Sequence, residues 1–156
     1  MNIEISPLKN YPDCISSVVN WIYHEWGKNN PHYWDSWIRS SLNTSGIPIT
    51  YVVLVDKNLV GTFSLWRCDL QSRQDLFPWF SAFYVDPQFR GKLYNGKKIS
   101  STILEFALKE LKLLGYHHVF LFTEKSPDFY ERNGWYIVGT TFDESDQLVT
   151  LCCHDL

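Results

Sequence analysis

The stretch of sequence that decides the fold runs from Val85 to Leu104 and reads V-D-P-Q-F-R-G-K-L-Y-N-G-K-K-I-S-S-T-I-L. The apolar run before it, residues 79–85, ends at a proline and is typical of a strand buried on both faces. A basic loop that contains glycine follows, and apolar residues at helical spacing then predict a helix over residues 97–114. Because a helix start offers unpaired N–H groups and a partial positive charge, this arrangement suits a phosphate or pyrophosphate.

Basic residues concentrate in this loop. Arg90, Lys92, Lys97 and Lys98 lie within nine positions of one another. The same charges also fit an ordinary solvent-exposed loop, since the glycine spacing matches no standard phosphate-binding pattern. The loop alone therefore leaves both interpretations open.

The segments on either side alternate between strand and helix patterns. We expect strands at 2–5, 49–55, 59–66, 79–85, 119–123, 135–141 and 148–154, and helices at 13–26, from 31 onward, at 97–114 and at 127–133. The hairpins imply antiparallel pairing, and the strand–helix–strand unit in the second half implies a local parallel pair. The predicted fold class is therefore α/β (α+β): a mixed, mostly antiparallel central sheet flanked by helices, in one domain over residues 1–156.

Composition limits the classes of function. The 156 residues are 45% hydrophobic and 20% charged, which fits a chain that buries its own core. The net charge of -3 argues against nucleic-acid binding. The charged start does not fit a signal peptide, and no apolar run is long enough to cross a membrane. The four cysteines form no C-x-x-C pair, so we expect a cytoplasmic protein with neither membrane nor metal binding.

A second stretch, Leu121 to Trp135, reads L-F-T-E-K-S-P-D-F-Y-E-R-N-G-W. With it, the chain resembles the GNAT N-acetyltransferase superfamily. Residues 85–91 match the V-x-P-x-[YF]-R-G that opens the family's central loop, and residues 114–116 match its Leu-Gly-[YF] helix end. Phe129-Tyr130 and Gly134-Trp135 match its F-Y-x-x-x-G-[FW] motif. The order of elements agrees over essentially the whole chain, so the resemblance implies the GNAT fold and a single acetyltransferase domain.

The cofactor loop departs from the family pattern R/Q-x-x-G-x-G/A. Reading back from the helix places Asn95 at the arginine position, Lys98 at the first glycine and Ser100 at the second. Reading forward from the strand instead places Arg90 and Gly91 correctly and leaves five residues over. A tandem duplication, in which residues 89–93 resemble 94–98, reconciles the two readings. Side chains at the glycine positions either crowd a pyrophosphate or, for Lys98, compensate with charge.

The resemblance implies an acyltransferase that moves an acetyl group from acetyl-CoA, its co-substrate, to a primary amine by direct attack. The acceptor is then an unidentified small molecule or peptide. The residues that the resemblance assigns to acetyl-CoA binding are Phe83, Tyr84, Val85, Arg90, Gly91, Asn95, Gly96, Lys97, Lys98, Ile99, Ser100, Ser101, Thr123 and Ser126.

Two residues are the catalytic candidates. Tyr130 matches the family's phenol beside the sulfur, where it acts as a general acid toward the thiolate leaving group. Glu124, at the end of a strand, is the best candidate for a general base. The other titratable residues expected beside the acceptor are His24 and Glu25 on the first helix, and Asp69 and Asp75 in a flanking loop. Deprotonation through water, without a dedicated base, is the alternative.

Other functions remain open at this stage. The altered loop favours a non-catalytic GNAT-like binding or regulatory module with a degenerate cofactor site, whereas the complete motif around Tyr130 favours an enzyme. A different phosphate-binding protein would use the basic loop but leaves the second motif unexplained. Both a monomer and a homodimer fit the sequence.

Overall fold

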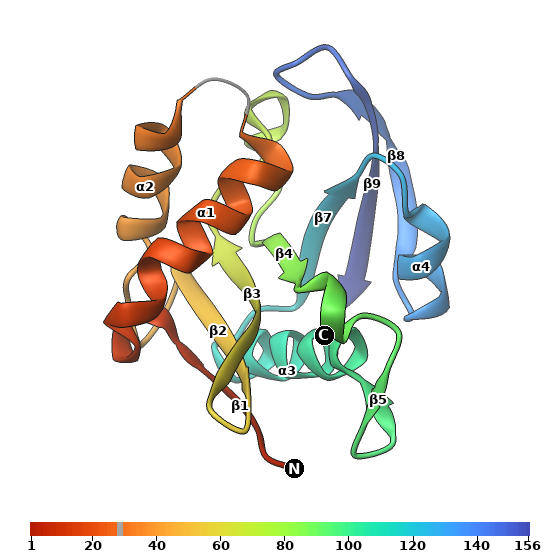
Figure 1. The fold of residues 1–156 in the computed structure, drawn as a ribbon. Helices are drawn as coiled ribbons and strands as arrows, with labels where there is room; N and C mark the ends of the chain where they lie inside the picture. Colours follow the sequence, from red (N-terminus) through yellow and green to blue (C-terminus); the bar gives the residue numbers. More distant parts are fainter. Residues whose placement is uncertain (28–29) are drawn as a thin grey trace. The chain divides into compact units, whose positions relative to one another are not determined.

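The computed structural model describes residues 1–27 and 30–156 (Figure 1). The chain divides into two compact units, which we call the first unit (residues 1–65 and 82–104) and the second unit (residues 66–81 and 105–156). Strand β4 (Trp79–Val85) and helix α3 (Ile99–Leu113) each have residues in both units. Each unit is described by itself below.

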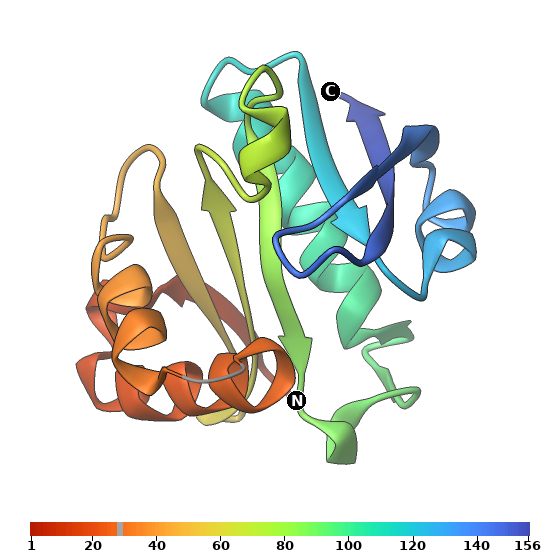
Figure 2. The ribbon, with the colours of Figure 1, turned by 90° about the horizontal axis from the view of Figure 1, so that it is seen from above.

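The first unit is built on antiparallel strands. Strand β1 (Ile3–Pro7) pairs with β2 (Ile49–Val55), and β2 pairs with β3 (Asn58–Trp66). Every residue of β2 is buried. Helices α1 (Ile15–Trp26) and α2 (Pro31–Arg39) lie together on one face of these strands, and the first turns of α3 lie on the other face (Figure 2). Short 3-10 turns at Leu8–Asn10 and Pro12–Cys14 lead into α1, and one at Pro87–Phe89 follows β4.

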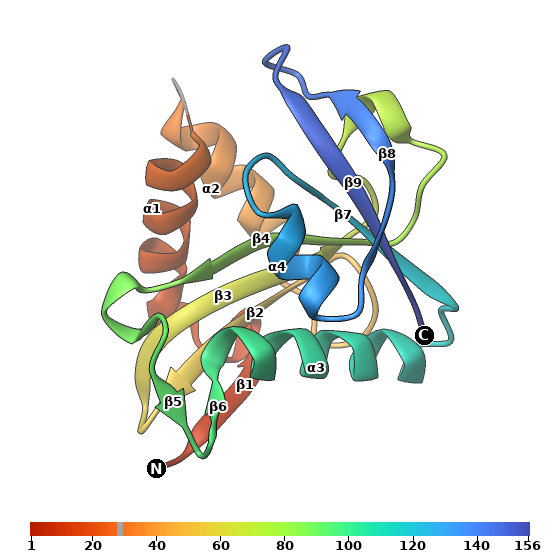
Figure 3. The ribbon, with the colours of Figure 1, turned by 90° about the vertical axis from the view of Figure 1, so that its right-hand side faces the viewer.

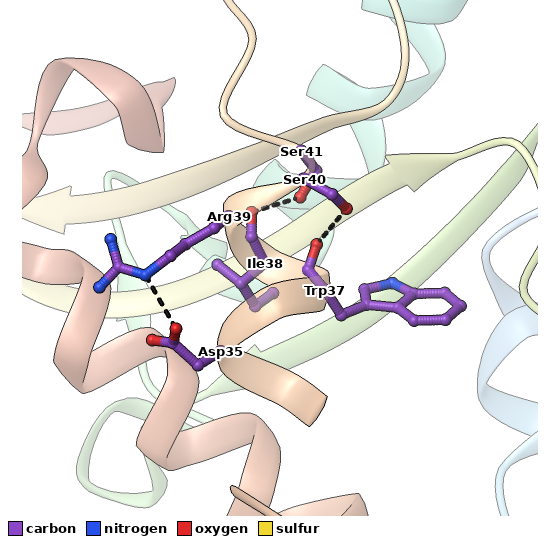
Figure 4. Close-up of polar contacts among 6 residues, drawn as sticks. All are labelled: Asp35, Trp37, Ile38, Arg39, Ser40 and Ser41. Atoms are coloured by element: carbon purple, nitrogen blue, oxygen red, sulfur yellow. Dashed lines mark hydrogen bonds and ion pairs between the residues drawn. The ribbon is translucent and has the colours of Figure 1, made fainter. Parts of the chain in front are cut away.

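Hydroxyl groups fasten the end of α2 to the strands. Ser41 Oγ donates to the carbonyl of Ile38, one turn earlier, over 2.9 Å (Figure 4). It also lies 2.7 Å from Thr50 Oγ1 on β2. Thr50 Oγ1 in turn lies 2.7 Å from Ser64 Oγ on β3. Ile38 of the same helix is fully buried. Because Ser41, Thr50 and Ser64 hydrogen-bond to one another or to the backbone, these three hydroxyls stay in the core at little cost in desolvation.

The second unit contains the C-terminal part of the sheet. The first residues of β4 pair in parallel with β7 (His118–Thr123) at Trp79 and Phe120. Strand β9 (Leu148–Asp155) runs antiparallel to both β7 and β8 (Tyr136–Phe142). The remaining elements are α4 (Pro127–Arg132) and a 3-10 turn at Gln71–Arg73. The core on one face comprises Leu70, Trp79, Val149 and Leu151, with Leu76, Phe120 and Phe122 packed against them.

The strand order β1-β2-β3-β4-β7-β9-β8 confirms the predicted fold class: a mixed sheet of seven mostly antiparallel strands, flanked by helices. The parallel pair is the one that the strand–helix–strand pattern indicated. Among the described residues, no helix has the length and apolar character needed to cross a membrane. Cys14, Cys68, Cys152 and Cys153 are all free thiols.

The prediction was wrong for the start of the long helix. Residues 97 and 98 do not begin α3, because they form a short strand, β6 (Lys97–Lys98), paired with β5 (Leu93–Tyr94). The hairpin then leads straight into α3 at Ile99 (Figure 3). Its turn residues, Asn95 and Gly96, have φ of 51° and 80°. Two left-handed residues make a type I′ turn, which Asn-Gly favours strongly.

Two features shape the middle of the sheet. Ala82, inside β4, has a left-handed φ of 50°, which interrupts the regular strand conformation and costs about 1 kcal/mol or more. On β3, a Cβ added at Gly61 would lie 2.9 Å from the carbonyl oxygen of Tyr84. The glycine therefore allows the backbones of β3 and β4 to approach closely in the first unit.

A comparison of two glycine substitutions tests this packing. Gly61→Ala is expected to lower the free energy of unfolding by about 2–3 kcal/mol, because its new methyl meets a backbone oxygen that cannot rotate away. Gly96→Ala should cost only about 1 kcal/mol, because no atom lies within 4 Å and the cost comes from φ alone. Urea unfolding of both variants measures the difference, and equal losses would contradict the close approach.

Candidate active site

The end of β4 is fixed by the loop that follows it. Arg90 Nε donates to the carbonyl oxygen of Val85 over 2.6 Å, and the Arg90 guanidinium carbon lies 5.2 Å from the centre of the Tyr84 ring. Asp86 Oδ1 accepts from the backbone N–H of Gln88 over 2.9 Å. Arg90 therefore holds the strand end and the loop together, a role that the motif match did not include.

The N-terminus of α3 carries positive potential. Lys97 and Lys98 are exposed on β6, immediately before the helix, and the first turn of α3 has no acidic residue. Ile99 is 1% exposed and anchors this turn, while Ser100 and Ser101 are partly buried. Unpaired N–H groups, the helix dipole and two cations together suit a phosphate group.

The other predicted loop residues have different surroundings. Asn95 Nδ2 donates to the carbonyl oxygen of Met1 over 3.2 Å, so its side chain is directed toward the N-terminus. Gly91 and Gly96 have positive φ, and no atom would contact a Cβ at either. On β4, Phe83 and Tyr84 are partly buried and Val85 is 8% exposed.

In the second unit, the turn after β7 holds three predicted residues. Thr123 Oγ1 accepts from the backbone N–H of Ser126 over 3.1 Å, and this bond closes the turn. Ser126 is the N-cap residue of α4, although its own side chain makes no capping bond. Glu124 is exposed within the turn. The structure therefore gives Thr123 a structural contact and leaves Glu124 in solvent.

Tyr130 lies in an aromatic cluster in the second unit. Its ring centre is 5.0 Å from that of Phe129 and 6.0 Å from that of Trp135, both at steep interplanar angles. Burial raises the pKa of the Tyr130 phenol above its ordinary value, and the nearby Cys152 thiol adds to this effect. Tyr130 therefore keeps its proton at neutral pH, as a hydrogen-bond or proton donor must.

A carboxyl group with a raised pKa, Asp69, also lies in the second unit. Desolvation raises the pKa of Asp69 to about 7; the Ser81 hydroxyl opposes the rise, and the charge of Glu144 adds to it. Ser81, on β4, is 4% exposed, and its hydroxyl interacts with the Asp69 carboxyl group. The sequence placed Asp69 with Asp75 in a loop flanking the expected acceptor, but nothing local in the sequence indicates that its carboxyl is desolvated.

The predicted residues thus fall into two sets. The first unit contains the end of β4, held by Arg90, and the basic hairpin that leads into α3. In the second, it brings together the turn after β7 and the aromatic cluster around Tyr130. Among the described residues, no group of three or more His, Cys, Asp or Glu side chains is arranged to hold a metal ion.

Comparison with known proteins identifies the family. The family model described as acetyltransferase (GNAT) domain matches residues 47–137, which is more than half of the chain. The chain therefore belongs to the GNAT acetyltransferase family, which confirms the resemblance found in the sequence. A search of curated proteins found no match to the sequence.

Solved structures with the same fold include several acetyltransferases. One is an aminoglycoside 6'-N-acetyltransferase complexed with coenzyme A, with a TM-score of 0.74, 14% identity, and 99% of this chain and 97% of that chain covered. Another is the aminoglycoside 6'-N-acetyltransferase from Enterococcus faecium, with a TM-score of 0.69, 13% identity, and coverage of 99% and 97%. A third is the spermidine/spermine N-acetyltransferase from Vibrio cholerae, with a TM-score of 0.69, 16% identity, and coverage of 99% and 95%.

The raised pKa of Asp69 predicts how the stability of the protein depends on pH. Its folded pKa of about 7 lies above the ordinary 3.8, so the folded state prefers the protonated acid. The contribution of Asp69 to the free energy of unfolding is greatest below about pH 4, and it is lost as the pH rises to about 7. Since one pH unit between the two pKa values corresponds to about 1.4 kcal/mol, Asp69→Asn should gain roughly 2–4 kcal/mol over the wild type between pH 4 and pH 8.

Urea unfolding of the wild type and Asp69→Asn at both pH values measures that gain. Asp146→Asn is the matched control, because Asp146 is exposed and asparagine tolerates its left-handed φ of 57°. A constant difference between wild type and Asp69→Asn at the two pH values would contradict a raised pKa.

Proposed function

We propose that this protein is an acetyl-CoA-dependent N-acetyltransferase that transfers an acetyl group to a primary amine by direct attack. The observation that carries the proposal is the family match over residues 47–137, a range that includes the end of β4, the basic hairpin and the motif around Tyr130. The shared fold with acetyltransferases, one of them complexed with coenzyme A, supports it.

Cofactor binding in this proposal rests on the start of α3. The pyrophosphate accepts hydrogen bonds from the N–H groups of Ile99, Ser100 and Ser101, and Lys97 and Lys98 supply charge from the preceding strand. Lys98 takes the place of a family glycine, but α3 begins after it. Its side chain is therefore outside the first helical turn, and charge compensates for the lost close approach of the backbone.

The transfer itself needs a polarised carbonyl and a protonated leaving group. We assign the backbone N–H groups of Phe83 to Val85 to the thioester and its pantetheine arm, as the family resemblance implies. The amine nitrogen attacks the carbonyl carbon, the new C–N bond forms, and the C–S bond breaks as coenzyme A thiolate leaves. Tyr130, which burial keeps protonated, donates its proton or a hydrogen bond to the sulfur.

The acceptor in this proposal is a small-molecule amine, with a peptide amine as the second possibility. Aminoglycoside and spermidine/spermine acetyltransferases of the same fold support the first. A non-catalytic binding module remains the alternative function, because Lys98 and Ser100 occupy glycine positions of the cofactor loop. The two functions differ in their affinity for acetyl-CoA.

Calorimetric titration with acetyl-CoA tests the proposal. The wild type should bind with micromolar affinity, and Lys97→Ala/Lys98→Ala should bind about tenfold or more weakly, since charge-assisted hydrogen bonds are worth about 1.5–3 kcal/mol each. Lys109→Ala/Lys112→Ala is the matched control, because it removes two exposed cations from the last turns of the same helix and should leave affinity unchanged. No binding by the wild type at millimolar acetyl-CoA would exclude the enzyme and favour the binding module.

The role of Tyr130 makes a separate prediction. Tyr130→Phe keeps the ring packing with Phe129 and Trp135 and removes only the buried hydroxyl. We expect kcat to fall about 10- to 100-fold, with the acetyl-CoA Kd and the thermal midpoint unchanged or slightly raised. Thiol release with an amine substrate measures kcat. A variant with wild-type kcat would show that the phenol has only a packing role.

A further inference from the structure

We infer that two copies of this chain form a symmetric dimer through strand β8, in which the sheet continues from one copy into the other. Both a monomer and a homodimer fit the sequence, and the surface of β8 favours the homodimer. The dimer goes beyond the proposed function and does not depend on it, because the two copies would associate with or without acetyl-CoA.

Strand β8 has one backbone edge that pairs with no other strand. It is the last strand in the order of the sheet, and among the described residues it pairs only with β9 (Figure 1). The register with β9 is irregular between Ile137 and Gly139, but Gly139 to Phe142 pair with β9 without a further shift. The backbone N–H and C=O groups of this regular part that point away from β9 can therefore bond to another strand.

The opposite edge strand of the sheet, β1, carries features that oppose such pairing. Its sequence, I-E-I-S-P, contains the charged Glu4 and ends at Pro7, a residue without a backbone N–H. The sequence of β8, Y-I-V-G-T-T-F, contains neither a charged residue nor a proline. Apart from its one irregularity, β8 therefore lacks the features that usually keep an exposed edge from pairing, as we expect for a strand that has a partner.

A patch of exposed apolar side chains lies along this edge. Phe142 and Leu148 are directly opposed on β8 and β9, and Ile137 is opposed to Cys152, which lies on the same face of β9 as Leu148. The side chains of Ile137, Val138, Phe142 and Leu148, which we call the edge patch, are between 45% and 58% exposed. Because adjacent apolar side chains are stabilised by removal from water, the edge patch favours burial against a partner.

The chemistry of this surface favours a second copy as that partner. An antiparallel pair of identical strands is symmetric about a two-fold axis, so β8 can pair with its own copy and bring the two edge patches together. Because β8 carries no charge, this pairing places no like charges opposite each other.

The charges that flank β8 are also complementary in such a dimer. Antiparallel pairing places the end of each β8 toward the start of the other. The turn that follows β8, residues 143–146, reads D-E-S-D and is acidic. Arg132, which precedes β8 at the end of α4, is exposed and forms no ion pair within the described part of the chain. The acidic turn of one copy therefore lies toward a basic side chain of the other.

The area involved is sufficient for a specific interface. Each side chain of the edge patch leaves roughly 100 Å² exposed, so the two patches together would bury about 800 Å². The paired backbone edges and the exposed Thr140 add to this area. The total reaches about 1,000 Å², which is near the lower limit for a specific protein–protein interface, so we expect a micromolar dissociation constant.

Sedimentation equilibrium of the full chain tests the dimer. At about 100 μM, well above a micromolar dissociation constant, the wild type should have twice the mass of the chain. Thr140→Lys and Phe142→Lys each place a lysine on both copies at the paired edge, so they should raise the dissociation constant at least tenfold. Leu113→Lys is the matched control, because it adds the same charge at an exposed apolar residue at the end of α3 and should leave the dimer intact. Circular dichroism confirms that each variant is folded.

Hydrogen exchange of the wild type tests the same interface without a substitution. The backbone N–H groups of residues 139–142 should exchange several-fold more slowly at about 100 μM than at about 0.1 μM, because pairing protects them. Equal exchange at the two concentrations would overturn the β8 interface, even if the lysine variants failed to fold. A wild type that stays monomeric at about 100 μM would overturn the dimer. A dimer that folded Thr140→Lys and Phe142→Lys leave unchanged would exclude β8 as its interface.

Discussion

The left-handed conformation of Ala82 divides strand β4 into a buried first part, which pairs with β7, and a last part, which Arg90 holds. Before Ala82, Trp79 pairs with β7 and is fully buried in the core. After Ala82, the strand ends at Val85, whose carbonyl is held by Arg90. A left-handed alanine inside a strand is unfavourable by about 1–2 kcal/mol, so burial on either side must stabilise it. Ala82 therefore lies at the boundary between the buried start of the strand and the segment that the proposed function assigns to the thioester.

Most of this architecture was predictable from local patterns. Residues 79–85 are almost wholly apolar, which indicated a buried strand, and β4 has those bounds. The helix over 97–114 was predicted from its apolar period, which is the same whether the helix begins at residue 97 or 99. Periodicity therefore missed the β5–β6 hairpin, although Asn95-Gly96 is the strongest short-range turn signal and marked it. The basic residues around this turn are typical of an exposed loop, so the sequence did not indicate two short paired strands.

The candidate site was predictable only in part, for a physical reason. Motifs specify residue type and spacing, and these were enough to single out Tyr130 and the start of α3. The sequence does not specify burial that arises from distant segments. Asp69 lies among charged and polar neighbours in the chain, as an exposed loop residue would. Its raised pKa depends on desolvation by the packed chain, and on the charge of Glu144 more than seventy positions later. No window of sequence contains both.

The distribution of charge also fits the two substrates of the proposed reaction. The net charge of -3 hides a segregation, because four of the fourteen Lys and Arg residues lie between positions 90 and 98. The second unit instead holds the Asp69 carboxyl group, with the charge of Glu144 acting on it and Arg73 paired with Asp75. Coenzyme A is a polyanion, whereas an amine acceptor arrives as a cation. In the proposed reaction, the basic segment attracts coenzyme A and the acidic groups attract the amine. The net charge alone does not show this separation of charge.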